Sequence, residues 1–438
     1  MVGDSLPQGW NWTTIDQVKK PDSKAIVSGP FGSNIGSRFF VGSGIPVIRG
    51  NNLTTDMRRF VEDGFVFITD EKAEELKNCE ALPNDLIFTA AGTLGQVGII
   101  PPNSKYPRYI ISNKQMRARL DENIILPLFA FLWLSSTEMV EYIEQRNTGS
   151  SVPLINLTVL RQLPIPLPPL PEQRAIARIL GALDDKIELN RRMNHTLEEM
   201  ARALFKSWFV DFDPVTAKAE GRVPFGMNAE TASLFPAEFE ETEEGVIPKG
   251  WRVGSVGESF DLIMGQSPPG ETYNEVEEGI AFYQGRTDFG TRYPTPRIYC
   301  TAPTRFANPG DTLVSVRAPV GDTNMANEKC SIGRGLAAVR HKSGSRSFTY
   351  YSMLFLKEEF DVFEGEGTLF GSISGDGFRN IKTVIPSPEI ISEFERKVYS
   401  IDQTIENNEG QIKSLASIRN GLLPKLMSGE VRVKIRKN

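Results

Sequence analysis

Few residues of this chain have the types and spacing that enzymatic chemistry requires. Its two histidines, His195 beside an apolar repeat of helical spacing and His341 in a basic turn, predict solvated or structural roles. GQSPPGET (Gly265–Thr272) has the glycine spacing of a phosphate-binding loop, but glutamate stands where lysine is required. FEGEG (Phe363–Gly367) superficially matches an S-adenosylmethionine loop, yet no Asp/Asn-Pro-Pro-Tyr/Phe motif follows it. Asp184-Asp185-Lys186 lies within a helical repeat that has no sheet to place a metal ion. The sequence therefore predicts no catalytic residue and no metal site.

Loops rich in Arg, Asn, Gln, Gly and aromatic residues predict a different chemistry, the recognition of DNA. Arginine reads guanine bidentately, Asn and Gln read adenine, and glycine lets the backbone approach phosphates. One polar loop is weak evidence, but two diverged sets on a shared framework favour two recognition surfaces. The first set of candidates comprises Ser33, Asn34, Arg38, Arg49, Asn51, Asn52, Arg58, Arg59, Thr93, Gln96, Lys114, Gln115 and Arg117. The second set comprises Gln266, Ser267, Tyr283, Gln284, Arg286, Arg292, Tyr293, Arg297, Arg317 and Arg334.

Two long helices with heptad spacing must position these loops. The first apolar seam runs from Ile176 to Trp208, 33 residues, or roughly 50 Å at 1.5 Å per residue. A second seam repeats it 218 positions later, so Asn190 falls on Asn408. Because a seam needs a partner, we expect the helices to form an antiparallel coiled coil in which Asn194 faces Asn408 as a buried register lock; solvated breaks in a loose seam are the alternative. The predicted seam residues are Ile176, Leu180, Leu183, Ile187, Asn190, Asn194, Leu197, Leu204, Val398, Ile401, Ile405, Asn408, Ile412, Leu415 and Leu422.

The two helices also differ. Arg419 replaces Ala201, and Pro424 predicts a bend or an end near Leu423, since proline inside a helix costs roughly 3 kcal/mol. FKSWFVDFDP (Phe205–Pro214) holds more bulky apolar residues than one seam can bury. We interpret this stretch as a docking site for another protein, with packing against the chain's own second domain as the alternative. The predicted partner-binding residues are Phe205, Trp208, Phe209 and Phe212.

The globular segments before the two helices repeat each other. IPKGW (Ile247–Trp251) echoes LPQGW (Leu6–Trp10), and later short runs rich in Val, Ile and Phe recur in the same order between turn residues, which predicts mixed α/β domains in tandem. The expected organisation is a first domain 1–168, a central helix 169–212, an acidic surface linker 213–245, a second domain 246–387, a distal helix 388–430 and a basic tail 431–438.

Charge and cysteine content fit an intracellular chain. The net charge of −6 seems unfavourable for binding DNA, but residues 211–245 hold nine acidic and two basic residues, a net of −7, so the remainder sums to +1. Cys79, Cys300 and Cys330 lack the spacing of zinc ligands and predict free thiols in a reducing cytoplasm. No run of 18 apolar residues and no secretory signal is present, so we expect a cytoplasmic protein without membrane spans.

With these features the chain resembles the specificity subunit of a type I restriction–modification system. The stretch Leu163–Val215 is similar to the central conserved region of that family, and Ile385–Val431 to its distal conserved region. The resemblance implies two target recognition domains held apart by the coiled coil in a pseudo-two-fold arrangement, each domain reading one half of a bipartite site on double-stranded DNA.

The resemblance also implies partners. Two modification subunits would bind the helices, hold S-adenosylmethionine and methylate adenine, and restriction (motor) subunits would use ATP and Mg for translocation and cleavage. The chain itself would hold no cofactor and catalyse nothing. Two alternatives stay open: a coiled-coil scaffold that binds two proteins without DNA specificity, and a stand-alone methyltransferase or nuclease.

Overall fold

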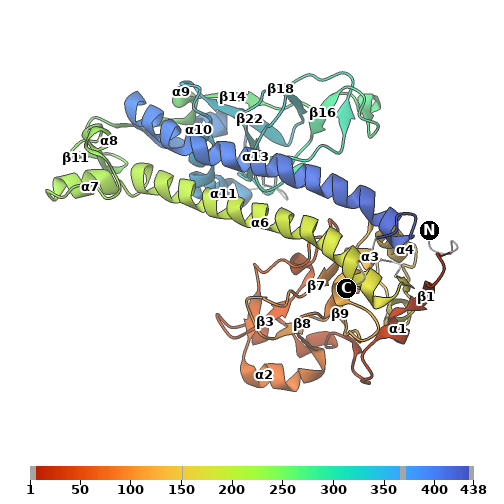
Figure 1. Cartoon of the computed structure of the whole chain (residues 1–438). Coiled ribbons are helices and arrows are strands. Elements are labelled where there is room, and N and C mark those ends of the chain that lie inside the picture. The colour runs from red at the N-terminus through yellow and green to blue at the C-terminus, as the bar shows by residue number, and fades with distance from the viewer. Residues whose placement is uncertain (1–5, 150, 366–370, 434–438) are drawn as a thin grey trace. The chain divides into compact units, whose positions relative to one another are not determined.

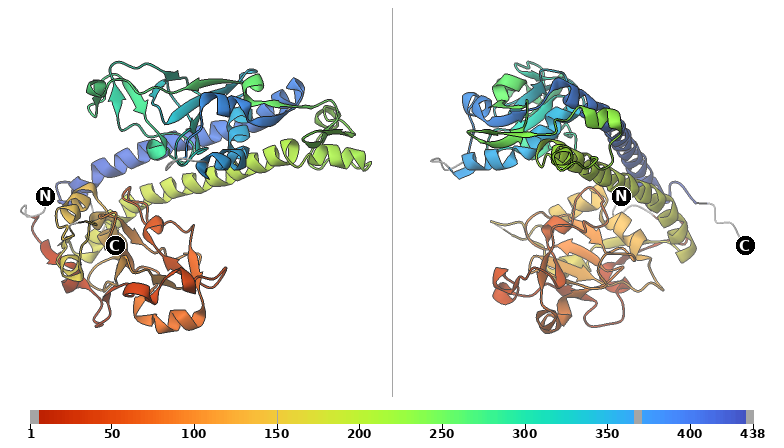
Figure 2. Two further views of the ribbon diagram at one scale, coloured as in Figure 1. Left: turned by 180° about the vertical axis from the view of Figure 1, so that it is seen from behind. Right: turned by 90° about the vertical axis from the view of Figure 1, so that its left-hand side faces the viewer.

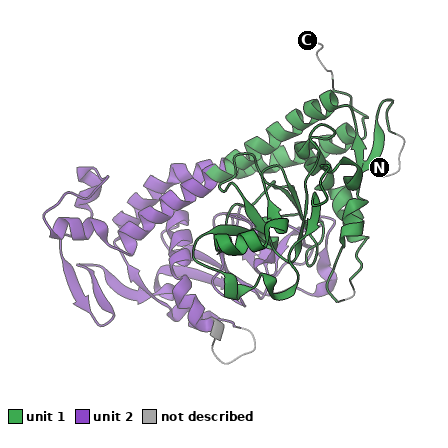
Figure 3. Cartoon of the chain, turned by 90° about the horizontal axis from the view of Figure 1, so that it is seen from below, with its two compact units in different colours: residues 1–192, 408–438 green, residues 193–407 purple. Residues whose placement is uncertain are grey.

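The computed structural model describes residues 6–149, 151–365 and 371–433, which form two compact units (Figures 1 and 3). Unit 1 comprises residues 1–192 and 408–438, and unit 2 comprises residues 193–407. Two 40-residue helices, α6 (Leu170–Phe209) and α13 (Pro388–Met427), each contribute one part to each unit. Among the described residues, no helix combines the length and apolarity needed to cross a bilayer. From residue 366 the FEGEG stretch lies outside the described residues, as does the basic tail from residue 434.

Unit 1 is built on two four-stranded sheets and a two-stranded ribbon. The sheets have the orders β2 (Ile26–Ser28), β9 (Gln115–Ala118), β6 (Leu86–Thr89), β7 (Val97–Ile99) and β4 (Val66–Ile68), β3 (Ile45–Ile48), β8 (Tyr109–Ile111), β5 (Glu80–Ala81), and the ribbon pairs β1 (Asn11–Thr14) with β10 (Pro164–Leu167). Helix α3 is apolar on all sides and almost wholly buried, so it forms the centre of the core. The other helices are α1 (Ile15–Val18), α2 (Asp70–Glu75), α3 (Pro127–Leu134), α4 (Thr137–Glu144) and α5 (Leu157–Arg161), with 3-10 turns η1 (Gly32–Asn34), η2 (Ser37–Phe39), η3 (Gly50–Asn52) and η4 (Lys77–Cys79).

Unit 2 repeats this plan with different loops. Its main sheets have the orders β14 (Phe260–Met264), β22 (Leu336–His341), β19 (Thr312–Ser315), β20 (Thr323–Met325) and β15 (Tyr273–Asn274), β17 (Tyr299–Cys300), β16 (Ile280–Tyr283), β21 (Cys330–Ile332), β18 (Phe306–Ala307). Two ribbons pair β11 (Phe239–Thr242) with β12 (Gly245–Pro248) and β13 (Arg252–Ser255) with β23 (Lys382–Ile385). The shorter helices are α7 (Asp213–Ala219), α8 (Ala229–Ser233), α9 (Val256–Ser259), α10 (Arg346–Phe355), α11 (Lys357–Gly365) and α12 (Gly375–Asn380), with 3-10 turns η5 (Gly270–Thr272) and η6 (Arg286–Asp288).

The two units share most of their strand order, although β15 and the β11–β12 ribbon of unit 2 have no counterpart among the described strands of unit 1. The order β2-β9-β6-β7 in unit 1 matches β14-β22-β19-β20 in unit 2, and all these pairs are antiparallel. In the second sheet of each unit one parallel pair stands out, β3 with β8 and β16 with β21. The sequence repeat is thus matched by a repeated strand order, and the mixed α/β class is confirmed.

Within each unit the parts of α6 and α13 pack side by side in opposite directions (Figure 2). In unit 1, Asp184 binds Arg419 at 2.8 Å, and further along α6 the Asn190 amide donates to Gln411 Oε1, earlier on α13, at 3.2 Å. In unit 2, the ring centroids of Phe205 and Phe394 lie 5.6 Å apart. None of the predicted seam residues is exposed. The facing of Asn194 and Asn408 joins residues of different units and stays a prediction.

The structure corrects two expectations about chain ends and connections. Of the bend or end predicted near Leu423, the end is wrong: helix α13 continues to Met427, because Leu423, Leu426 and Met427 are buried in the core of unit 1 and their packing outweighs the cost of Pro424. The bend stays a prediction. Segment 213–245 is not a surface linker, since it forms α7, α8 and β11, and its Phe235 is buried in the core of unit 2.

The docking role predicted for the aromatic residues at the end of α6 is also wrong. These residues form part of the core of unit 2. Phe205, Trp208 and Phe209 are buried, and Phe212 is half-buried. Their rings meet those of Phe348, Phe355 and Phe394 from α10 and α13, Phe235 after α8, and Trp251 and Phe239. The alternative interpretation, packing within the chain's own second domain, describes these side chains.

Candidate nucleic-acid interface

Four loops of unit 1 meet at one edge of its sheets. Because β3 and β8 are parallel, Arg49 and Ser112 follow their strands at the same edge. The loop after β2 joins them, since Gly29 donates its N–H to the Gln115 carbonyl at 2.9 Å. The loop after β6 is placed there too, because the last residue of β6, Thr89, pairs with Gln115. A Cβ on Gly29 would lie 1.8 Å from the Ser112 carbonyl oxygen, so this close approach of two loops requires glycine.

The half-buried amide of Gln96 and the buried amide of Asn52 hold these loops together. Gln96 Nε2 donates to the carbonyls of Gly50 at 3.2 Å and Leu53 at 3.0 Å. Asn52, fully buried, donates to the carbonyls of Val61 and Asp63 at 3.0 and 2.8 Å. Amides that satisfy buried backbone carbonyls are structural, because they leave few groups for a ligand.

The structure divides the first set of candidates. Arg117 is buried with a 3% exposed fraction, and its guanidinium donates to the carbonyls of Glu80, at 2.8 Å, and Lys24. Burial lowers the pKa of Arg117, an effect that Asp85 opposes. Gln115 and Asn52 are also buried, so these three predictions of base contacts are wrong. The exposed candidates on the loops of this edge are Ser33, Asn34, Arg38, Asn51, Thr93 and Lys114, and Arg49 and Gln96 are half-buried.

Unit 2 gathers the equivalent loops, after β14, β16, β19 and β21. Gly333 and Gly335 donate to the carbonyls of Tyr283 and Gln284 at 2.8 and 3.0 Å, which brings the loops after β16 and β21 together. The backbone N–H of Gln266 donates to the Ile332 carbonyl at 3.0 Å, and the backbone N–H of Arg334 donates to Ser267 Oγ at 3.2 Å. The exposed candidates on these loops are Gln266, Gln284, Arg286, Arg317 and Arg334, with Ser267 half-buried.

Two candidates of the second set are buried instead, and one basic residue was missed. Tyr283 is fully buried, and burial raises the pKa of its hydroxyl. Arg292 has a 2% exposed fraction, so a base contact is excluded for both in this structure. Arg305 is exposed, and its carbonyl accepts from the Ile332 N–H at 3.1 Å beside the gathered loops. Nothing in its TAPTRF context repeats a motif of the first half, so the sequence carried no signal for it.

The remaining candidates stand outside the two loop edges. Arg58 and Arg59 face helix α6, where Arg59 binds Asp185 at 2.7 Å and Arg58 lies 3.5 Å from Glu188. Arg297 is exposed and binds Asp288 at 3.2 Å, and Tyr293 is half-buried. The side chains that tie Arg58 and Arg59 to a helix make direct base contact by them unfavourable.

The surroundings of the two histidines and the three cysteines indicate no reaction site among the described residues. His341 is buried, its ring Nδ1 lies 2.7 Å from Ser343 Oγ, and burial lowers its pKa; His195 is exposed. Among the described residues, no cluster of His, Cys, Asp or Glu could hold a metal ion, and the three cysteines are buried free thiols.

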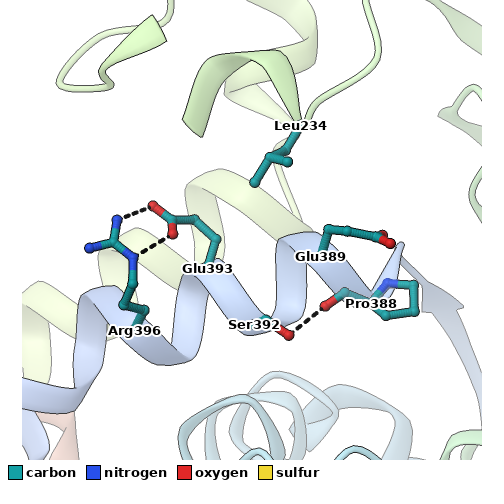
Figure 4. Close-up of a pocket in the computed structure, with 6 residues that line it drawn as sticks. All are labelled: Leu234, Pro388, Glu389, Ser392, Glu393 and Arg396. Carbon is teal, nitrogen blue, oxygen red and sulfur yellow. Dashed lines mark hydrogen bonds and ion pairs between the residues drawn. The ribbon is translucent and has the colours of Figure 1, made fainter. Parts of the chain in front are cut away.

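A shallow pocket of about 420 Å³ at the start of α13 is lined by Leu234, Pro388, Glu389, Ser392, Glu393 and Arg396 (Figure 4). Glu393 and Arg396 bind each other at 2.6 Å, and the Ser392 hydroxyl donates to the Pro388 carbonyl at 2.9 Å. Thr231 of α8 donates to Glu393 at 2.7 Å. These groups satisfy one another, which is typical of a structural contact rather than a reaction site.

Comparisons with known proteins decide the family. The family model described as "Type I restriction modification DNA specificity domain" matches residues 37–199. The HindI specificity subunit, a type I restriction enzyme subunit of Haemophilus influenzae, is 30% identical over 400 residues, covering 76% of this chain and 85% of that protein. This chain belongs to the type I restriction enzyme specificity subunits. A putative MjaX specificity subunit of Methanocaldococcus jannaschii is 28% identical, covering 89% of this chain and 88% of that protein. For this specificity subunit, recognition of a DNA sequence is the function that the family implies.

A solved relative agrees at the level of the fold. The crystal structure of a type I restriction–modification system S subunit from M. genitalium covers 97% of both chains with 16% identity and a TM-score of 0.52. At this identity the likeness concerns the fold alone. It is a second line of support for the arrangement of sheets and long helices described above.

Proposed function

We propose that this specificity subunit reads a bipartite DNA site, with the loop edge of unit 1 on one half-site and the loop edge of unit 2 on the other. One observation carries the proposal: corresponding loops gather at corresponding sheet edges in both units, yet expose different residues. Unit 1 offers Ser33, Asn34, Arg38, Asn51, Thr93 and Lys114, and unit 2 offers Gln266, Gln284, Arg286, Arg317 and Arg334. A shared scaffold with different reading residues suits a site whose halves differ in sequence.

The two long helices are proposed to act as an antiparallel coiled coil that sets the spacing of the half-sites in a pseudo-two-fold arrangement. The antiparallel contacts within each unit and the fact that no predicted seam residue is exposed support this role. One heptad added to both helices would lengthen them by about 10.5 Å, close to the rise of three base pairs. The recognised spacer should lengthen correspondingly, and an unchanged spacer would refute the ruler.

The same helices are proposed to bind two adenine-methyltransferase subunits, which would hold S-adenosylmethionine, and restriction subunits that use ATP and Mg would join them. Helix α6 exposes Met193 and Met200, which stand seven residues apart and therefore on one helix face. Exposed methionines are well suited to a partner surface. They replace the buried aromatic residues as the docking candidates, while catalysis is assigned to the partners and not to this chain.

The test is to co-express the chain with its modification subunit and sequence the methylated motifs of the host. We expect one bipartite motif. Asn34→Ala with Lys114→Ala should then relax the motif in one half, and Gln284→Ala with Arg334→Ala in the other, each good contact being worth about 1–3 kcal/mol of discrimination. Lys249→Ala, exposed but outside the loops, is the matched control.

Two results would refute the proposal. If both pairs of substitutions relaxed the same half, the assignment of one half-site to each unit would be wrong. If the chain showed no salt-sensitive DNA binding with or without the modification subunit, a scaffold that binds two proteins would be favoured instead.

A further inference from the structure

Two arginines, Arg59 in unit 1 and Arg292 in unit 2, occupy equivalent positions in their domains. The Arg59 carbonyl accepts from the N–H of Ile99, the last residue of β7, at 2.8 Å. The Arg292 carbonyl accepts from the N–H of Met325, the last residue of β20, at 2.9 Å. Because β7 and β20 hold the same place in matching sheets, the two residues are structural counterparts, which we call the loop arginines.

Both loop arginines reach an equivalent aspartate on the long helices. Arg292 binds Asp402 of α13 at 2.7 Å, and Arg59 Nε lies 3.9 Å from Asp184 of α6. Asp184 and Asp402 are 218 positions apart, which is the offset of the helix repeat. An arginine and an aspartate therefore stand at matching positions in both units, hydrogen-bonded in unit 2 and 3.9 Å apart without a hydrogen bond in unit 1.

In unit 2 the guanidinium of Arg292 joins its loop to three helices, α6, α10 and α13. Arg292 donates from one nitrogen to Glu198 of α6 at 2.7 and 2.9 Å and to the Tyr351 hydroxyl of α10 at 3.1 Å, and from another nitrogen to Asp402. Its Cζ lies 3.9 Å from the ring centroid of Tyr350. Loop, α6, α13 and α10 are thus fixed by one planar group with directional hydrogen bonds.

In unit 1 two arginines make the same connection. Arg59 binds α6 through Asp185 at 2.7 Å and the Gly181 carbonyl at 3.0 Å. Arg419 of α13 binds Asp184 at 2.8 Å and donates to the Asp56 carbonyl of the loop at 3.3 Å. The loop, α6 and α13 are again linked by guanidinium groups. Arg59 links the loop to α6, and Arg419 links α13 to both α6 and the loop.

The contacts of Arg292 and the Arg419–Asp184 pair are largely buried, and a buried ionic contact is a poor choice for stability alone. Removing charges from water is unfavourable, and an apolar contact of similar volume is often at least as stable. Burial raises the pKa of Asp402 and of Glu198, and although burial alone would lower the pKa of Arg292, Asp402, Tyr350 and Glu198 raise it well above its ordinary value, so the arginine stays charged. An apolar contact tolerates sliding and rotation, whereas a forked set of hydrogen bonds to two helices does not.

We propose that the loop arginines Arg59 and Arg292 are positioning residues that fix the angle of each recognition domain on the helix pair and thereby restrict the spacer length that the chain accepts. The inference rests on the proposed reading of a bipartite site. A spacer one base pair longer moves the second half-site by about 3.4 Å and turns it by about 35°. A domain held by directional bonds cannot follow that rotation, and a domain freed from them can.

The experiment compares Arg59→Met and Arg292→Met with the unchanged chain, each assembled with its modification subunit. Competition binding is measured on duplexes with the native spacer and with spacers one base pair longer or shorter, and separately on duplexes with single substitutions in each half-site. We expect the preference for the native spacer to fall on the order of tenfold in each variant, with base preferences unchanged. Arg252→Met removes an exposed ion pair of unit 2 with Glu258 and should change neither.

A second measurement does not depend on DNA. Hydrogen exchange of the free chain should rise at residues 53–59 and 181–185 in Arg59→Met while the β6–β9 core keeps its protection. Arg59 is half-buried, so this variant is expected to fold and decides the matter if Arg292→Met does not.

The proposal is overturned if folded Arg59→Met keeps the native spacer preference and exchange pattern, or if it loses base preference at particular positions, which would mean a direct contact with DNA. If the unchanged complex lacked sequence-specific binding, the proposed function would fail, and hydrogen exchange alone would judge the positioning role.

Discussion

Replacing Trp208 separates a core role for the end of α6 from a docking role. The side chain has a 2% exposed fraction and meets the rings of Phe235 and Phe394 at centroid distances of 5.1 and 6.0 Å. A tryptophan buries up to about 250 Å², which at roughly 25 cal/mol per Å² gives an upper estimate of ~6 kcal/mol. Observed costs of Trp→Ala in cores are about 3–5 kcal/mol, because neighbours relax partly into the cavity.

We therefore expect Trp208→Ala to lower the free energy of unfolding of unit 2 by about 4 kcal/mol, or its Tm by about 10 °C. The assay is thermal unfolding followed by circular dichroism, combined with capture of the modification subunit by the folded chain at low temperature. Met200→Ala is the matched variant, because it lies on the same helix with a 56% exposed fraction. It should leave the Tm unchanged and weaken capture. A Trp208→Ala chain with unchanged Tm and lost capture would refute the assignment of these rings to the core.

Three further predictions concern polar groups. Arg38→Ala should reduce the salt dependence of DNA binding by about one phosphate contact, whereas Arg117→Ala should lower the Tm, because Arg117 is buried. Burial raises the pKa of Asp184 above 3.8, so its ionisation lowers the stability of the fold as pH rises from 3.8 through the folded pKa; Asp184→Asn should flatten that part of a Tm–pH curve. Asn190 is buried, and its side-chain amide donates a hydrogen bond to Gln411. Asn190→Leu should therefore raise the free energy of unfolding by about 1 kcal/mol in a denaturant titration.

The long helices could be predicted from the sequence because a heptad seam encodes both a helix and its need for a partner. Ile176 and Ile405 are buried as the spacing requires, and Asn190 contacts its neighbour helix. The repeated framework could be predicted for a similar reason, since strands and turns follow local patterns. The contacts of an arginine side chain could not be predicted from the residues next to it in the sequence. Arg292 resembles the loop residues around it, yet its partners Glu198 and Asp402 lie 94 and 110 positions away.

The same limit explains the two misassigned segments. The rings of Phe205 and Trp208 looked surplus because one seam cannot bury them, but the helix meets a second layer, α10 with Phe348 and the chain after α8 with Phe235. The acidic composition of segment 213–245 predicts a linker. Its local signals were present, a Pro214 in the first turn of α7 and an Asn228 side chain capping α8, and they predict helices where composition predicts a linker.

Arginine serves two separable purposes in this specificity subunit, and exposure divides them. Arg38, Arg317 and Arg334 are exposed at the loop edges, where a guanidinium can exchange water for a phosphate or a guanine. Arg117 and Arg292 are buried, the guanidinium of Arg117 on backbone carbonyls and that of Arg292 on carboxylates, so neither charge is exposed to DNA. Net charge is therefore a poor guide to DNA binding in such a chain. Arg292 is paired with two carboxylates, Glu198 and Asp402, so this cluster adds to the negative total without lying at a loop edge. The sign of the reading surface is set by the cations that are exposed there.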